Sequence, residues 1–140
     1  MEAIKIRDID SNDIPFIFST WLKSYKHSSA FAKRITNDVF FDFHHRLVDA
    51  IIRRPQTLIK VACLAEDPFV IIGYLVSEDT RPAVIHYLFV KKAFRQMRVA
   101  QILLNTLEQD PGECVFTHWS YDADHLLRKY PNATYNPYLI

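Results

Sequence analysis

The sequence predicts a single α+β domain over residues 1–140, built on a mixed, mostly antiparallel β-sheet flanked by helices. Three patterns predict this class. Two segments in the first half carry apolar residues at helical spacing. Three short apolar runs then follow one another with only turns between them, which indicates consecutive antiparallel strands. A strand, a helix and another strand follow, and this order predicts one parallel crossover.

The composition is that of a globular protein, since 49% of the 140 residues are apolar and 24% are charged. The net charge of +1 argues against nucleic acid or a membrane surface as partner. No run approaches the roughly 20 apolar residues of a membrane span, and the first residues lack the apolar core of a signal peptide. Cys63 and Cys114 stand in apolar runs and are expected as buried thiols, which predicts a cytoplasmic protein.

The first half of the chain is expected to form one strand and two helices. Residues 4–7 alternate apolar and charged side chains, as a half-buried strand does. The stretch DIDSNDIP offers N-cap residues, and Pro15 suits the first turn of a helix whose apolar stripe covers residues 14–25. A second helix is predicted over residues 37–53, because Pro55 follows its end.

The second half is expected to complete the sheet. The patterns predict strands at 58–64, 69–76, 84–90 and 114–118, helices at 95–109 and 122–129, and an extended segment at 133–140. The last segment contains TYNPYLI, which would be an edge strand open to pairing with another chain. A homodimer is therefore a further expectation.

The stretch FVKKAFRQMRVAQILL joins the third of these strands to the helix after it. Its basic side chains have no acid among them: Lys91, Lys92, Arg95 and Arg98. A helix start already presents unpaired backbone N–H groups and a partial positive charge. The stretch therefore indicates an anion site suited to a polyphosphate ligand, or else a solvated basic turn.

Within this order of elements, the same stretch resembles the signature of the GNAT superfamily, the acyl-CoA-dependent N-acetyltransferases. That signature runs V-x-P-x-[YF]-R-x-x-G-x-[GA]-x-x-L-[LI]. The matching positions are Val90, Phe94, Arg95, Ala100, Leu103 and Leu104. Two positions depart from it, because Lys92 stands where proline is common and Arg98 where the family has its central glycine. The resemblance implies a GNAT-like domain and acetyl transfer to an amine.

The resemblance also implies a site for acetyl-CoA, with coenzyme A as the bound product. The pantetheine arm is expected along the edge of the strand at Leu88, Phe89 and Val90. The pyrophosphate is expected at Arg95 and at the backbone N–H groups of Gln96, Met97, Arg98, Val99, Ala100 and Gln101. Ser120 takes the asparagine position of a second family pattern, N-x-x-A-x-x-x-Y, and is expected beside the cofactor. Recognition through the main chain lets side chains vary.

The near absence of glycine bears on this site. Only Gly73 and Gly112 are present, so a Walker or dinucleotide-binding loop is excluded. Because residue 98 is expected inside a helix, glycine would not be needed there for its dihedral angles, only for close approach of a phosphate. The Arg98 side chain is expected either to point aside and grip a phosphate oxygen or to fill the pocket.

Acetyl transfer needs a base for the ammonium proton and an acid for the leaving thiolate. His86 is predicted as the base, since strand alternation places residues 84, 86, 88 and 90 on one face and its unperturbed pKa is about 6.5. A structural histidine bonded to backbone is the alternative. The family's acid is a tyrosine of the last helix, but Leu127 takes that position in SYDADHLLRKYPN. Tyr130 and Tyr121 are the remaining candidates, with water as the other proton source.

The other histidines predict no metal site. His44 and His45 are adjacent, so on a helix they point in different directions, and His118 and His125 lack a companion at metal-ligand spacing. The connection SYKHSSAFAKRITND, between the first two helices, is expected to form the acceptor side, for a small-molecule or peptide amine. The alternative function is a GNAT-fold protein that has lost catalysis and serves as a binding or structural component, for example in a phage.

Overall fold

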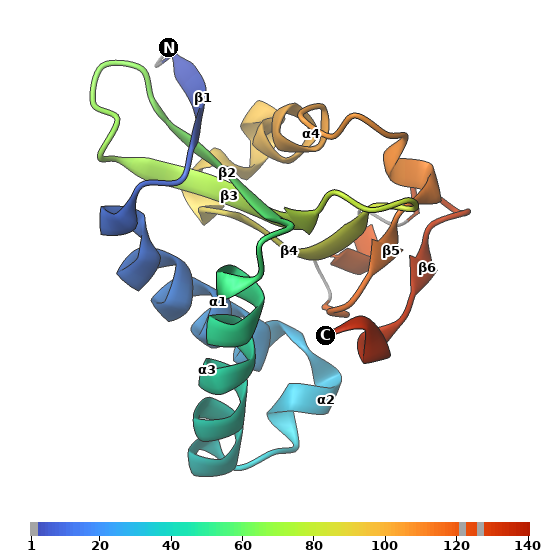
Figure 1. Ribbon diagram of the computed structural model, residues 1–140. Coiled ribbons are helices and arrows are strands. Elements are labelled where there is room, and N and C mark those ends of the chain that lie inside the picture. Colours follow the sequence, from blue (N-terminus) through green and yellow to red (C-terminus); the bar gives the residue numbers. More distant parts are fainter. Residues whose placement is uncertain (1–2, 121–122, 126–127) are drawn as a thin grey trace.

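The computed structural model describes residues 3–120, 123–125 and 128–140. Its centre is a six-stranded sheet in which the spatial order of the strands follows the chain (Figure 1). The strands are β1 Ile4–Asp8, β2 Thr57–Leu64, β3 Ile71–Glu78, β4 Val84–Val90, β5 Val115–Phe116 and β6 Thr134–Tyr135. The pairs from β1 to β4 are antiparallel, whereas β4–β5 and β5–β6 are parallel. This architecture confirms the predicted α+β class.

Helices cover both faces of the sheet. On one face lie α1 Ile14–Ser28, the short α2 Ala30–Lys33 and α3 Asn37–Arg53, and on the other lies α4 Val99–Leu104 (Figure 1). Each face has its own buried apolar cluster, the first centred on Trp21 and Tyr74 and the second on Leu75 and Leu103. No helix in the described part of the chain is long and apolar enough to cross a bilayer.

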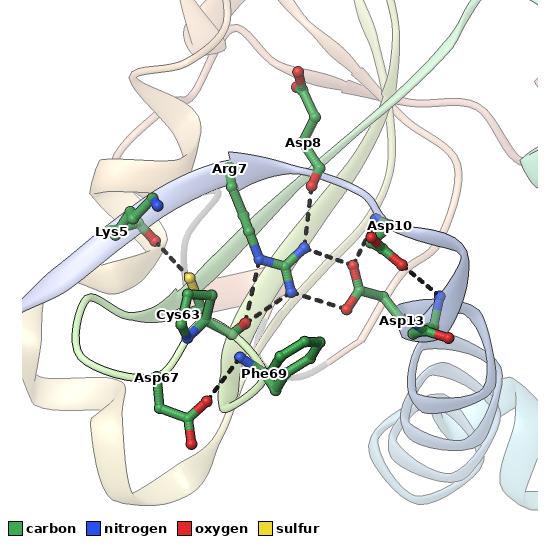
Figure 2. Close-up of polar contacts among 10 residues, drawn as sticks. Lys5, Arg7, Asp8, Asp10, Asp13, Cys63, Asp67 and Phe69 are labelled. Atoms are coloured by element: carbon green, nitrogen blue, oxygen red, sulfur yellow. Dashed lines mark hydrogen bonds and ion pairs between the residues drawn. The ribbon is translucent and has the colours of Figure 1, made fainter.

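An ion pair between the half-buried Arg7 and the buried Asp13 fixes the entry into α1. The Asp10 side chain accepts from Asn12 N at 2.9 Å, and Asp13 Oδ2 accepts from Asp10 N at 2.7 Å. Asp13 also binds the Arg7 guanidinium through two bonds of 2.7 and 2.9 Å (Figure 2). A second acceptor for Arg7 is the carbonyl of Pro68 at 2.9 Å. One guanidinium therefore joins β1, the start of α1 and the β2–β3 connection.

A β-bulge interrupts the pairing of β3 with β4. Val76 lies opposite Tyr87, but Ser77 lies opposite Ile85, so His86 is the extra residue on β4. Ile85 consequently packs in the same cluster as Leu88 and Val90. The alternation predicted from residue 84 to residue 90 is therefore broken at the bulge.

The predicted helix over residues 95–109 is wrong in its bounds. A 3₁₀ helix, Lys92–Met97, replaces its first turn, and α4 ends at Leu104. Arg98 separates the two with a left-handed backbone, φ 58° and ψ 26°. At the other end, Thr106 Oγ1 donates to the Leu103 carbonyl at 2.6 Å, a side-chain bond that competes with further helix.

Four other predicted elements differ in their bounds. β3 begins two residues after the predicted start because Asp67 Oδ1 accepts from Phe69 N at 3.2 Å and holds a turn there. Of the strand predicted at 114–118, only Val115–Phe116 form strand β5. The extended segment predicted at 133–140 contains β6 and a 3₁₀ helix, Pro137–Leu139. The helix predicted at 122–129 lies partly outside the described residues, of which 123–125 are helical.

Candidate active site

The sheet opens where β4 and β5 diverge. β5 pairs with β4 only at Val84 and Ile85, so the edge of β4 beyond the bulge has no strand neighbour among the described residues. Lys91 N donates to Ile72 O on β3 at 2.8 Å, and antiparallel bonds alternate along a strand. The backbone groups of Leu88 and Val90 therefore face the open edge.

A cavity of about 300 Å³ lies along this open edge. One wall is β4 from Ile85 to Val90, and the opposite wall is the segment after β5. The remaining lining residues are Ser24, Arg95, Ala100, Phe116, His118, Ser120, Ala123, His125 and Lys129. The cavity thus reaches from α1 to the loop that precedes α4.

The structure places about half of the predicted site residues on this cavity. Its lining includes His86, Leu88, Phe89, Val90, Arg95, Ala100 and Ser120. Ser120 Oγ accepts from Ala123 N at 3.1 Å, which positions the segment opposite β4. Gln96 and Met97 belong to the 3₁₀ helix before Arg98.

The other predicted residues lie off the cavity. Val99 is buried in the cluster beneath α4. The Tyr130 hydroxyl donates to Gln101 Oε1 at 3.1 Å, and neither residue is part of the lining. Tyr121 and Leu127 lie outside the described residues.

Arg98 does not occupy a helical position. Its left-handed backbone lies in the region that favours glycine, so the expectation that glycine has no dihedral role here is wrong. The Arg98 side chain is exposed and does not line the cavity. Of the two arrangements expected for this side chain, the structure therefore shows it pointing aside.

The positive charge of the cavity comes from a different set of residues than the sequence predicted. Arg95 lines the cavity, and its Nε donates to the Val90 carbonyl at 3.2 Å. Lys91 instead lies over the Phe16 ring, 5.3 Å from its centroid. His125 and Lys129 line the cavity with Arg95, so two segments far apart in the sequence contribute basic side chains to its lining.

His86 is held from both sides. It is 1% exposed, with Nε2 2.5 Å from Glu78 Oε2 and Nδ1 2.9 Å from Thr117 Oγ1. Burial lowers the pKa of His86 and outweighs the opposing influence of Glu78, which keeps the ring neutral at pH 7. Both partners are side chains, in contrast to the backbone-bonded alternative. Because both nitrogens are engaged, His86 has no lone pair free to take a proton directly.

Glu78 is a buried carboxylate with a full set of donors. Burial disfavours its charge, but the bonds from His86, from Gln56 Nε2 at 2.7 Å and from Arg54 Nη1 at 3.2 Å outweigh that penalty. The pKa of Glu78 is therefore lowered, and the group is ionised at pH 7. The sequence analysis did not identify this residue.

Two more histidines join this network. His118 Nδ1 lies 2.9 Å from Thr117 Oγ1, and its Nε2 lies 3.0 Å from Nε2 of His44. The His44 ring stacks against Tyr25 and Phe40. Burial lowers the pKa of His44 to about 4, and burial with repulsion by the other histidines lowers that of His118 well below its usual value.

These contacts could not be found from spacing along the chain. His44 was set aside because its neighbour His45 points in a different direction, and His118 because it lacks a companion at metal-ligand spacing. Residues 44, 86 and 118 nevertheless join one network through the packing of α3 on the sheet and the parallel register of β5. Within the described residues, no group of three or more His, Cys, Asp or Glu is arranged to hold a metal ion.

Comparison with known proteins identifies the fold. No family model and no curated protein matches the sequence. Among solved structures, "histone acetyltransferase HPA2 and related acetyltransferase" from Corynebacterium glutamicum matches with a TM-score of 0.64 at 16% identity, over 92% of this chain and 83% of that one. A GNAT-family acetyltransferase from Staphylococcus aureus Mu50 matches with a TM-score of 0.54 at 17% identity, over 75% and 64% of the two chains.

A third similar structure contains coenzyme A. It is the aminoglycoside N-acetyltransferase AAC(6')-Iy in complex with CoA, with a TM-score of 0.56 at 13% identity, over 93% of this chain and 88% of that one. The chain therefore has the acyl-CoA N-acyltransferase fold of the GNAT superfamily, as the resemblance in its sequence predicted.

Proposed function

We propose that this chain is a divergent GNAT N-acetyltransferase that moves an acetyl group from acetyl-CoA to an amine of a small molecule or peptide. The observation that carries the proposal is the cavity of about 300 Å³ along the open edge of β4. Its lining combines a strand edge without a neighbouring strand in the described part of the chain, basic side chains and two members of a buried histidine network. The acceptor, the cytoplasmic location and a homodimer through residues 133–140 are parts of the same proposal.

The cavity fits an acyl-CoA in two respects. Pantetheine is an extended chain with two amides, and an open strand edge such as Leu88–Val90 binds extended amide chains through its backbone. Arg95 and Lys129 supply positive charge and hydrogen-bond donors for phosphate, and His125 adds a polar side chain to the same lining. When bound, acetyl-CoA supplies a thioester carbonyl as the acetyl donor.

The base function is assigned to His86 together with Glu78, and since both imidazole nitrogens are hydrogen-bonded, the proton reaches His86 through its neighbour Thr117. The carboxylate holds the imidazole in one orientation through the 2.5 Å bond. Ser24, Tyr87 and His118 line the cavity on the side of α1, where the acceptor amine is expected. The acid for the thiolate remains assigned to Tyr130, Tyr121 or water.

One observation favours the alternative of a GNAT-fold protein without catalysis. The Tyr130 hydroxyl is bonded to Gln101 away from the cavity, and the only described tyrosine in the lining is Tyr87 on β4. A protein of that kind, of phage origin for instance, would bind a ligand or partner without turnover.

The test is calorimetric titration of acetyl-CoA into the protein. We expect micromolar binding by the wild type and about tenfold weaker binding by Arg95→Ala, because a charged hydrogen-bond donor is lost. Lys5→Ala, which removes an exposed cation from β1, is the charge-matched control and is expected to bind as the wild type does. Free-thiol release with a panel of amines then separates the two functions. Binding without turnover would favour the alternative, and no binding would overturn both.

A further inference from the structure

Five side chains form an unbroken hydrogen-bonded row through the sheet. In order they are Glu78, His86, Thr117, His118 and His44, and the distances between successive polar atoms are 2.5, 2.9, 2.9 and 3.0 Å. The row runs from the end of β3 through β4 and the end of β5 to α3. All five side chains are buried.

The ionised carboxylate fixes the direction of every bond in this row. Glu78 can only accept, so His86 carries its proton on Nε2 and presents a lone pair at Nδ1. The single Thr117 hydroxyl proton is therefore donated to His86, and Thr117 Oγ1 accepts from Nδ1–H of His118. Nε2 of His118 is then an acceptor, and His44 donates to it from Nε2–H. One arrangement thus satisfies all four contacts.

Two inner members of the row line the active cavity, whereas its two ends, Glu78 and His44, lie elsewhere. His86 and His118 line the active cavity. Glu78 lines a second cavity of about 130 Å³, together with Lys60, Asp79 and Gln109. At the opposite end, His44 Nδ1 makes no hydrogen bond with a described residue. His44 lies outside the lining of the active cavity and packs on Tyr25, which follows the lining residue Ser24 on α1.

We propose that this row is a proton relay that carries the proton of the acceptor amine away from the active cavity to Glu78 and the second cavity. The inference rests on the proposed function, since the proton comes from the ammonium that must become a nucleophile. Glu78 and Thr117 act through their neighbours and are positioning residues, whereas His44 is the member of the row that first takes up the proton.

The relay balances without any other reactant. The amine N–H bond breaks and a proton binds Nδ1 of His44 through water, since His44 is not part of the cavity lining. Nε2–H of His44 passes its proton to Nε2 of His118, and Nδ1–H of His118 passes its proton to Thr117 Oγ1. The Thr117 hydroxyl proton moves to Nδ1 of His86, and Nε2–H of His86 moves to Glu78 Oε2. The ammonium loses one positive charge and Glu78 loses its negative charge.

The pKa values of the side chains in the row favour passing a proton along the row over holding it on one residue. Burial keeps His44, His86 and His118 neutral, so none of them retains the proton as a stable cation. The lowered pKa of Glu78 favours release of the proton to water in the second cavity. After the proton leaves, the bonds from Arg54 and Gln56 stabilise the charged carboxylate of Glu78.

The first test reads the tautomers and needs no substrate. Imidazole ¹⁵N NMR of the wild type at pH 7 is expected to show three neutral rings, protonated on Nε2 in His44 and His86 and on Nδ1 in His118. A proton on Nε2 of His118 or on Nδ1 of His86 would break the row and overturn the relay.

The second test compares Thr117→Val, which lacks the hydroxyl, with Thr117→Ser, which keeps it. We expect kcat to fall at least tenfold in Thr117→Val while KM for acetyl-CoA is unchanged, and the solvent deuterium effect on kcat to disappear in that variant. Thr117→Ser should retain both kcat and the isotope effect. A thermal melt establishes that each variant is folded. If Thr117→Val is folded and as active as the wild type, the relay is overturned.

The two proposals fail in different ways. An active wild type with the wrong tautomers would overturn the relay and leave acetyl transfer standing. A wild type that binds acetyl-CoA but transfers to no amine would overturn the proposed function, and with it the catalytic use of the row, even if the tautomers are as expected.

Discussion

Arg98 adopts a backbone conformation that a residue with a Cβ atom reaches only at a cost. Its φ of 58° places it in the left-handed region, where a residue other than glycine is disfavoured by about 1–2 kcal/mol. The position matches the central glycine of the GNAT signature, so the fold itself explains why glycine suits it. The exposed guanidinium makes no hydrogen bond with the described residues that would offset this cost.

Arg98→Gly is therefore expected to stabilise the protein. The gain should be about 0.5–1 kcal/mol, since relief of the left-handed strain exceeds the extra chain entropy that glycine loses on folding. Urea denaturation measures it. Arg98→Ala is the matched control, because it removes the same guanidinium but keeps the Cβ, and it should give no gain. Equal effects of the two variants would assign the change to the side chain instead of the backbone.

Individual site residues were predictable where a local pattern marks them. Arg95 and Ala100 follow from the signature, and both line the cavity. His44, Glu78 and Thr117 could not be predicted, because their contacts depend on the bulge at His86 and on the parallel register of β5. Neither feature can be predicted from the apolar pattern. That pattern indicates which face of a helix or strand is buried, but not which residues of other elements it contacts.

At the scale of elements, the pairing of β3 with β4 builds the wall of the cavity and depends on Gly73. A Cβ placed on Gly73 would lie 2.6 Å from the Phe89 carbonyl oxygen, which is backbone and cannot turn aside. The close approach of these two strands at the cavity wall therefore requires a residue without a side chain.

Gly73→Ala is expected to destabilise the protein by about 1–3 kcal/mol, because the strands must separate to admit the methyl group. The matched control is Gly112→Ala, where the nearest atom to a Cβ is the Asp110 carboxylate oxygen at 3.2 Å, part of a flexible side chain. Denaturation midpoints of the two variants measure the difference. Equal losses would show that the contact at Phe89 does not limit the pairing.

The type and order of the elements were predictable, but their ends were not. Apolar periodicity fixed α1, α3 and the strands β1 to β4, whose faces are buried in the two clusters. The region around α4 deviates because its apolar stripe continues past Leu104, where the backbone turns. A stripe shows what is buried, and side-chain bonds such as that of Thr106 determine where a helix ends.

At the scale of the whole molecule, some charged side chains join segments that are far apart in the sequence. Arg7 is one of them, because it joins β1, the start of α1 and the β2–β3 connection (Figure 2). The bonds from Arg7 hold the pKa of Asp13 below its usual range, although burial acts in the opposite direction. The pair therefore stabilises the folded state only where Asp13 is ionised.

Asp13→Asn is expected to lower the free energy of unfolding by about 1–3 kcal/mol at pH 7, since the half-buried Arg7 guanidinium loses its charged acceptor. The difference from the wild type should be constant above about pH 5 and shrink as the pH falls below about 4, where Asp13 of the unfolded chain is protonated. Urea denaturation of both proteins at pH 7 and pH 3 measures this.

Asp49→Asn is the control for Asp13→Asn. Its carboxylate pairs with Arg53 on the exposed surface of α3, and such pairs contribute less than about 1 kcal/mol. A difference for Asp13→Asn that is the same at both pH values would show that the charge of Asp13 contributes nothing.

The open edge of β4 affects which substitutions the chain can tolerate during evolution. A ligand bound by backbone N–H and C=O groups is recognised through atoms that every residue except proline carries in full. Substitutions along Leu88–Val90 can therefore accumulate without loss of that recognition, provided that β5 stays apart from this edge. During evolution the separation of β4 from β5 must be conserved for this recognition, whereas the side chains along the edge can change.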